Sequence, residues 1–204
     1  DDDDHDESDT PEIMNSGLVE LTATLTDGDD DTDSDSIELG ALIKFEDDGP
    51  TVSLESDDGA MLVLDESLGA GGEGDPNADD ETNVNAHVDA IGYAAISGDD
   101  LFDITKDPGT DGEKSTAYTL SLSAGDSGLF DTESGEEVVL SMDGDDIIGM
   151  ADGAEVFRIS VDEDTGAVEV NQFRALVHGD DDDHDESDTP EIMNSGLVEL
   201  TATL

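Results

Sequence analysis

The sequence predicts an all-β protein built as an antiparallel β-sandwich. Apolar residues alternate with polar residues in short runs, the runs are separated by turns rich in Gly, Asp and Ser, and no segment shows helical periodicity. A period of two is typical of a strand with one buried face. Many short strands separated by such turns indicate a sandwich.

The expected strands follow one another along the chain. They cover residues 17–25, 36–45, 50–55, 61–66, 117–123, 136–142, 155–161 and 166–170. Two acidic segments between strands, Asp143–Asp146 and Asp162–Gly166, are expected to be hairpin turns, and Gly166 supplies a positive φ in the second. Residues 68–114 are poor in β-formers, so we expect a long loop or an irregular insertion there, with a strand or short turn near 86–96.

The chain repeats its own beginning. Residues 1–25 recur without a substitution as residues 180–204, which gives a period of 179 residues. This period is longer than the roughly 20–50 residues of solenoid repeats and suits a whole domain. We therefore interpret the chain as one period of a tandem array followed by the start of the next. A duplication introduced by cloning is the alternative.

The charge is extreme, with 59 acidic and 5 basic residues and a net charge of −54. Self-repulsion on this scale destabilises a compact state, so the chain is disordered, adapted to high salt or bound to multivalent cations. Hydrophobic residues make up 34% of the sequence and follow a strand pattern, which argues against disorder. Without Cys, neither disulfides nor a typical zinc site can stabilise the fold, whereas a bound hard cation can.

The acidic residues gather between the expected strands. Asp27, Asp29, Asp31 and Asp33 alternate within a ten-residue loop, a spacing that can direct several oxygens at one Ca²⁺. A solvated loop is the alternative. The run from Asp180 to Asp188 and its copy at Asp1–Asp9 are denser but less patterned, and they fit a loose Ca²⁺ site or a solvated loop equally well.

A second candidate site lies at a junction. Glu46, Asp47 and Asp48 precede Pro50, which suits a break between domains. A Ca²⁺ ion shared there with Asp65 and Glu66 of the following domain would stiffen the joint. A hydrophilic linker without an ion is the alternative.

Several function classes are disfavoured. The four His residues show no paired spacing, no nucleophile elbow, phosphate loop or Cys nucleophile is present, and nucleic acid would be repelled. There is no run of 18 apolar residues and no signal peptide in this segment. We expect no enzyme. The alternatives are a module that binds sugar, protein or ice, and a Ca²⁺-dependent hydrolase with a cleft formed by residues 68–114.

Six motifs occur in an order that resembles the long tandem repeat of giant RTX adhesins, which Gram-negative bacteria export by type I secretion. They are FEDDGPTV, LVLDES, YTLSLS, SGLFDTESGEEVVL, VFRISVD with GAVEVNQFRALVH, and LTATLTDGDDDTDS. The family's TDGDGD turn falls on Thr26–Asp31, with Asp30 in place of the second Gly, and its FEDDGP junction falls on Phe45–Pro50 unchanged.

The resemblance implies an immunoglobulin-like, calcium-stabilised β-sandwich that acts as an extender domain at the cell surface. Such repeats project distal ligand-binding domains for attachment and biofilm formation. The implied partners are neighbouring repeats joined through Ca²⁺-bridged linkers, with no membrane contact by this segment, and the implied state is a monomer or a strand-swapped dimer.

The domain boundary has two possible positions. If it lies at Pro50, residues 1–49 are the closing strands of one repeat, which complete a sandwich in cis or in trans, and residues 50–204 are the body of the next repeat. If it lies near Asp180, residues 1–179 form the whole domain. We prefer the first.

Overall fold

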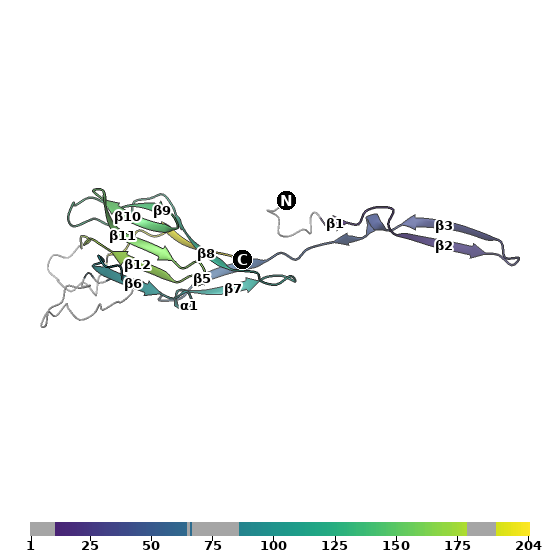
Figure 1. Ribbon diagram of the computed structural model, residues 1–204, viewed down its shortest axis with the longest axis horizontal. Coiled ribbons are helices and arrows are strands. Elements are labelled where there is room, and N and C mark those ends of the chain that lie inside the picture. The colour runs from purple at the N-terminus through teal and green to yellow at the C-terminus, as the bar shows by residue number, and fades with distance from the viewer. Residues whose placement is uncertain (1–10, 65, 67–85, 179–190) are drawn as a thin grey trace. The chain divides into compact units, whose positions relative to one another are not determined.

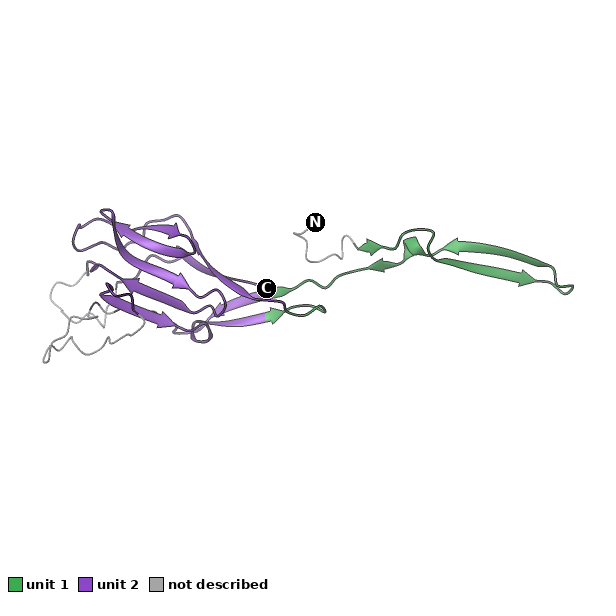
Figure 2. Ribbon diagram, viewed as in Figure 1, with its two compact units in different colours: residues 1–51, 106–113 green, residues 52–105, 114–204 purple. Residues whose placement is uncertain are grey.

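The computed structural model describes residues 11–64, 66, 86–178 and 191–204. The chain divides into two compact units (Figure 2). Residues 1–51 and 106–113 belong to the first unit, and residues 52–105 and 114–204 belong to the second.

The second unit is built on a five-stranded antiparallel sheet (Figure 1). Its strands lie in the order β6 (Gly92–Ile96), β12 (Val168–Gln172), β11 (Ala154–Val161), β10 (Asp146–Ala151) and β9 (Val139–Asp143). Strands β9 to β12 are successive hairpins. The two hairpin turns expected from the sequence are confirmed, and Gly144 and Gly166 have φ values of 68° and 70° in them.

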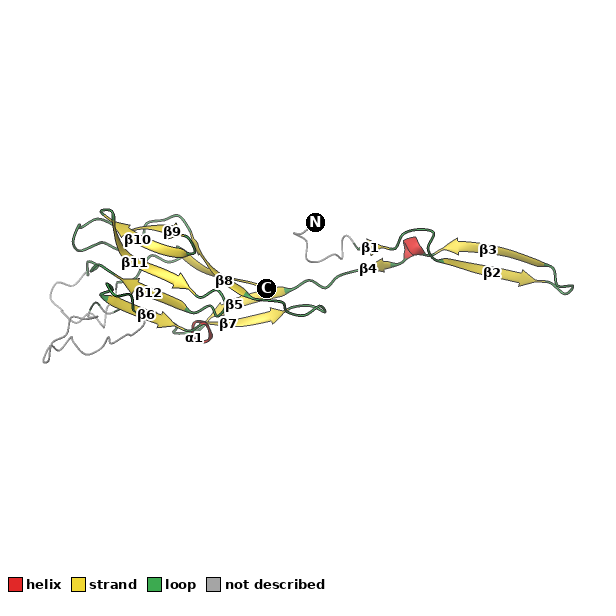
Figure 3. Cartoon of the chain, viewed as in Figure 1, coloured by secondary structure: helices red, strands yellow, loops and turns green. Residues whose placement is uncertain are grey.

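A second layer consists of β8 (Ala117–Leu122) paired with β13 (Val198–Thr203). Strand β8 contacts β9, β10 and β11, and Leu120 belongs to the same buried cluster as Ile147, Val156 and Val170. The alternating residues of β13 are half-buried and exposed in turn, as the period-two pattern predicts. The predicted all-β, antiparallel, sandwich-like fold is therefore confirmed (Figure 3).

Two further strands pair beside these layers. They are β5 (Thr51–Ser56) and β7 (Phe102–Asp107). The short helix α1 (Gly98–Leu101) connects β6 to β7, and the Ser97 hydroxyl accepts a hydrogen bond from the backbone N–H of Asp100 at its start. In the described part of the chain, helical structure is confined to α1 and one 3₁₀ turn, and neither has the length and apolarity of a membrane span.

The first unit contains two short antiparallel ladders. Strand β1 (Glu12–Ile13) pairs with β4 (Lys44–Phe45), and β2 (Glu20–Thr26) pairs with β3 (Thr32–Glu38) along seven residues each. The 3₁₀ turn η1 (Gly40–Leu42) joins β3 to β4.

Three expectations about these elements were wrong. Residues 36–45 are not one strand, because η1 interrupts them; a Cβ on Gly40 would lie 2.6 Å from the Asn15 carbonyl oxygen. Residues 61–64 form no strand, although Leu62 and Leu64 pack against the core. Residues 98–107, expected to be irregular, form α1 and β7, whereas β6 agrees with the strand or short turn expected near 86–96, and its Tyr93 is only 2% exposed.

Candidate metal centre

The turn between β2 and β3 is organised by one aspartate. The Asp27 carboxylate oxygen Oδ1 accepts hydrogen bonds from the backbone N–H of Asp31 at 2.9 Å and of Asp29 at 3.2 Å. The Asp27 N–H donates to the Asp31 carbonyl at 2.9 Å, which closes the hairpin. Asp30 adopts φ 70°, the left-handed conformation that Gly usually fills and that Asp tolerates.

This turn brings three carboxylates together. Ligand oxygens of Asp27, Asp29 and Asp31 lie within 4.8 Å of one another, and all three residues are exposed. Two oxygens bound to one Ca²⁺ at about 2.3–2.6 Å are at most about 5 Å apart. The three carboxylates can therefore reach a single ion of this size. The remaining ligands that Ca²⁺ requires would come from backbone carbonyls or water.

The hydrogen bonds also favour the ionised form of Asp27. A side-chain hydrogen bond from Asp29, then the backbone N–H groups of Asp31 and Asp29, hold the pKa of Asp27 below its usual range.

Asp33, the fourth residue predicted for this site, is not among the three that converge. It lies in β3 opposite Leu25, and its Oδ1 accepts a hydrogen bond from the backbone N–H of Ser34. Its assignment as a ligand stays a prediction.

The three acidic residues of the predicted junction site, Glu46, Asp47 and Asp48, follow β4 and are exposed. The Asp47 carboxylate accepts a hydrogen bond from the Asp48 N–H at 2.9 Å. Gly109 lies so close to the Asp48 carbonyl oxygen that no Cβ would fit there, and Gly109 has φ 69°. A turn at 107–112 therefore packs on the junction. Its Pro-Gly pair at 108–109 is the turn signal in the sequence, but nothing local indicates which segment it contacts.

The residues predicted to share the junction ion are placed differently. Asp65 lies outside the described residues, as do the acidic runs 1–9 and 180–188. Glu66 is half-buried in the second unit. Its Oε1 accepts hydrogen bonds from Gln172 Nε2 at 2.6 Å and from the Leu176 N–H at 2.8 Å, with His178 Nε2 at 3.7 Å. Glu66 therefore already has protein partners, and a role as an ion ligand stays a prediction.

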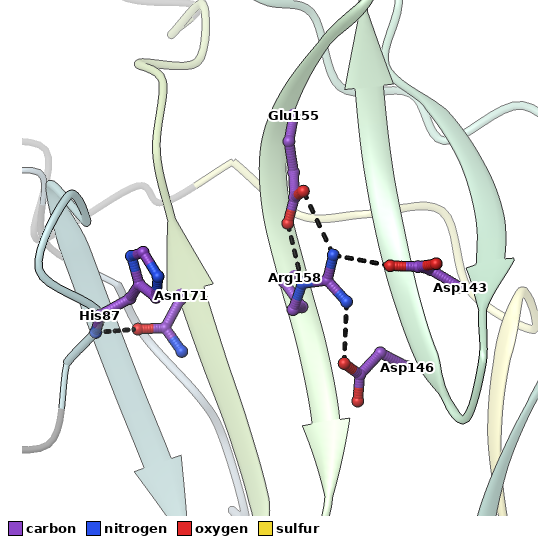
Figure 4. Close-up of polar contacts among 6 residues, drawn as sticks. All are labelled: His87, Asp143, Asp146, Glu155, Arg158 and Asn171. Carbon is purple, nitrogen blue, oxygen red and sulfur yellow. Dashed lines mark hydrogen bonds and ion pairs between the residues drawn. The ribbon is translucent and has the colours of Figure 1, made fainter.

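Both arginines form ion pairs inside the second unit. Arg158 on β11 binds Glu155, Asp143 and Asp146 at 2.8–2.9 Å and ties three strands together (Figure 4). These hydrogen bonds, led by Glu155, raise the pKa of Arg158. In the same view, the backbone N–H of His87 donates to the Asn171 side chain.

The second arginine, Arg174, pairs with a buried acidic residue. Arg174 binds Asp131, whose side chain is fully buried, at 2.8 Å and the exposed Glu133 at 2.9 Å. Because the sequence holds only five Lys and Arg for 59 acidic residues, such pairs neutralise a small part of the negative charge.

Comparison with known proteins gives a family but no characterised relative. No curated protein and no solved structure matches the chain. A family model described as a domain of unknown function (DUF5801) matches residues 61–204, which is more than half of the chain. The chain therefore belongs to the DUF5801 family.

Proposed function

We propose that this chain is a Ca²⁺-binding extender unit of a large tandem-repeat adhesin on a bacterial surface, and that it has no catalytic role. Its task is length and stiffness: it carries distal binding domains away from the cell. The observation that carries the proposal is the convergence of Asp27, Asp29 and Asp31 in a chain of net charge −54. The residue-for-residue repeat of 1–25 at 180–204 supports a tandem array.

Calcium fits this site better than other divalent ions do. The donors are carboxylates, whereas zinc prefers Cys and His ligands, which are missing from this cluster. Mg²⁺ demands a tighter octahedral shell at about 2.1 Å and keeps most of its waters. Neutralising three carboxylates at close range removes repulsion that grows steeply as the separation falls.

The mechanical effect follows from where the site lies. A two-stranded hairpin is marginally stable in water by itself, and β2 is exposed along its whole length. An ion held at the turn stabilises the hairpin by mass action, by about 2.7 kcal/mol when free Ca²⁺ is 100 times the Kd. The acids Glu46–Asp48, on which the 107–112 turn packs, would hold a second ion that stiffens the junction.

The test compares an acid in the cluster with one outside it. Asp29→Asn keeps the side-chain shape and removes the charge of one candidate ligand. Asp145→Asn is the control, because it removes one charge from the exposed β9–β10 turn, outside the cluster. We expect Asp29→Asn to weaken Ca²⁺ binding about tenfold or more in isothermal titration, and Asp145→Asn to leave it unchanged. Hydrogen exchange in residues 19–39 should slow when Ca²⁺ is added and quicken in EGTA. Equal Ca²⁺ binding by both variants would refute the proposal. So would a hydrogen-exchange rate in residues 19–39 that is the same with Ca²⁺ and with EGTA.

A further inference from the structure

In the described part of the repeated segment, residues 16–25 and their equivalents 195–204 form the same turn and strand but have different partners. Gly17 and its equivalent Gly196 have φ values of 81° and 78°, and a turn followed by a strand occurs at the same positions in both. In the second copy the strand pairs with β8, whereas in the first copy it pairs with β3. The burial differs accordingly: Leu197 is 6% exposed, and the equivalent Leu18 is 69% exposed.

The two pairings use opposite edges of the strand. In the first copy the Val19 carbonyl accepts from the Leu39 N–H, so Val19 directs its backbone groups toward β3. In the second copy the carbonyl of Leu197, the equivalent of Leu18, accepts from the Ser123 N–H, so this neighbouring position is the one directed toward β8. Successive residues of an antiparallel strand direct these groups to opposite edges. One strand with this sequence can therefore pair with β8 and β3 at the same time.

The side chains that β13 directs toward the core also have equivalents on a single face of the β2–β3 hairpin. Val198 and Leu200 of β13 pack against the core of the second unit. Their equivalents Val19 and Leu21 lie opposite Leu39 and Ile37, and cross-strand partners lie on the same face of a sheet. If β2 replaced β13 beside β8, Ile37 would lie on the core side. Leu21 and Ile37 are 58% and 57% exposed in the first unit, as an apolar face without a partner would be.

The second unit has room for this addition. A cavity of about 460 Å³ lies in this unit, and its walls are mostly apolar. Val198, Leu200, Ile192 and Met193 line it, and all four belong to the repeated segment. The equivalent of Ile192 in the first copy, Ile13, pairs with Lys44 of β4. Docking of the whole segment 11–45 would therefore place β3 and β4 at the side of the core that β13 and residues 191–193 now line.

We propose that residues 11–45 of one copy dock on the second unit of another copy, with β2 beside β8 in the place of β13, so that β3 and β4 complete the sandwich. The occupant is a second copy of this sequence, joined in tandem or supplied in trans. The proposal deepens the extender role by naming what each unit binds at its joint. It does not require Ca²⁺. Since donor and acceptor surfaces differ, the contact is head-to-tail and builds a chain of units.

Cross-linking tests the register, because the sequence contains no Cys. Ser121 lies opposite Glu199, whose equivalent in the first copy is Glu20. A chain with Ser121→Cys is mixed with a chain with Glu20→Cys in a glutathione redox buffer. Paired residues of this kind have Cα atoms about 5.5 Å apart, within disulfide range. Thr26→Cys is the register control, six residues further along the same face and therefore about 20 Å away.

The proposal predicts a heterodisulfide with Glu20→Cys at about ten times the yield obtained with Thr26→Cys, measured by intact mass. Leu21→Asp on the Glu20→Cys chain should abolish it. Because Leu21 is exposed in the free chain, that loss would not reflect unfolding. The equivalent change Leu200→Asp on the Ser121→Cys chain should raise the yield, since it weakens the β13 competitor. Equal yields from the two cysteine positions, or no effect of Leu21→Asp, would overturn the proposal.

The assay is run in Ca²⁺ and in EGTA. Cross-linking in register in both buffers supports strand addition, whatever the calcium measurements give. Failure in both buffers overturns the docking proposal and leaves the Ca²⁺ titration as a separate test of the extender function.

Discussion

Leu18 and Leu197 are the same residue of the repeated segment, so truncating each to Ala isolates the effect of environment. Leu197 is 6% exposed, and its side chain occupies the space that a Cβ on Gly125 would enter. Leu18 is 69% exposed. Truncating a buried Leu costs about 2–5 kcal/mol, through lost burial and the cavity left behind. Since β13 lies in a two-stranded layer that can partly collapse, we expect about 2–3 kcal/mol for Leu197→Ala.

For Leu18→Ala the expected cost is below about 0.5 kcal/mol, because little apolar surface is removed from water at this position. In a unit of this size, 1 kcal/mol shifts Tm by about 2–4 °C. Leu197→Ala should therefore lower the Tm of the second unit by roughly 4–12 °C, and Leu18→Ala by no more than about 2 °C. The assay is thermal unfolding by circular dichroism in dilute protein with excess Ca²⁺. Equal shifts from the two variants would show that the two copies are not packed as described.

Three other outcomes follow from the second unit. Asp131→Asn, which weakens the buried pair with Arg174, should destabilise by about 2–4 kcal/mol in urea unfolding, whereas Glu133→Gln should change stability by less than about 0.5 kcal/mol. Burial raises the pKa of Asp131, but hydrogen bonds from Ser134 and the Arg174 charge outweigh it, so the pKa is lowered overall. The ionised Asp131 therefore stabilises the fold fully above its unfolded pKa near 3.8, and this stability is lost as the pH falls through its lower, folded pKa. Asp131→Asn has no such group, so its stability should fall less steeply with pH in this range. Gly166→Ala should cost more than Gly153→Ala by about 1–3 kcal/mol, since both have positive φ but only the first would press a Cβ against Phe102, at 2.7 Å; equal losses would contradict this packing.

Much of the sandwich could be predicted because its strands carry their own pattern. Residues 117–122 and 154–161 alternate, and a period of two decides which face is buried whatever the partner strand is. The break in 36–45 depends on the approach of Gly40 to Asn15, which is far away in the sequence. Strand β6 is short and rich in small residues, so its own pattern is weak, and it is a strand because β12 pairs with it.

In the candidate metal centre, too, local sequence predicts some features and distant contacts decide others. Asp27, Asp29 and Asp31 converge because the Asp27 carboxylate accepts hydrogen bonds from residues two and four positions on, an effect that alternate spacing predicts. Asp33 follows the same spacing but already belongs to β3, where pairing with Leu25 directs its side chain. The contact of Gly109 with Asp48 joins segments about sixty residues apart, and a single sequence gives no sign of it.

The repeated segment shows why burial cannot be assigned from sequence alone in a tandem protein. Identical residues form the same turn and strand, yet one copy is covered and the other is exposed, because the second copy pairs with β8 of the sandwich and the first pairs with β3. If docking passes from unit to unit, each internal segment 11–45 is covered by the unit before it, and only the two ends of an array leave apolar surface or an open edge. Stability per unit should then rise as units are added, because the end contribution is shared among more of them. A chain of independent beads would instead unfold at one temperature at every length.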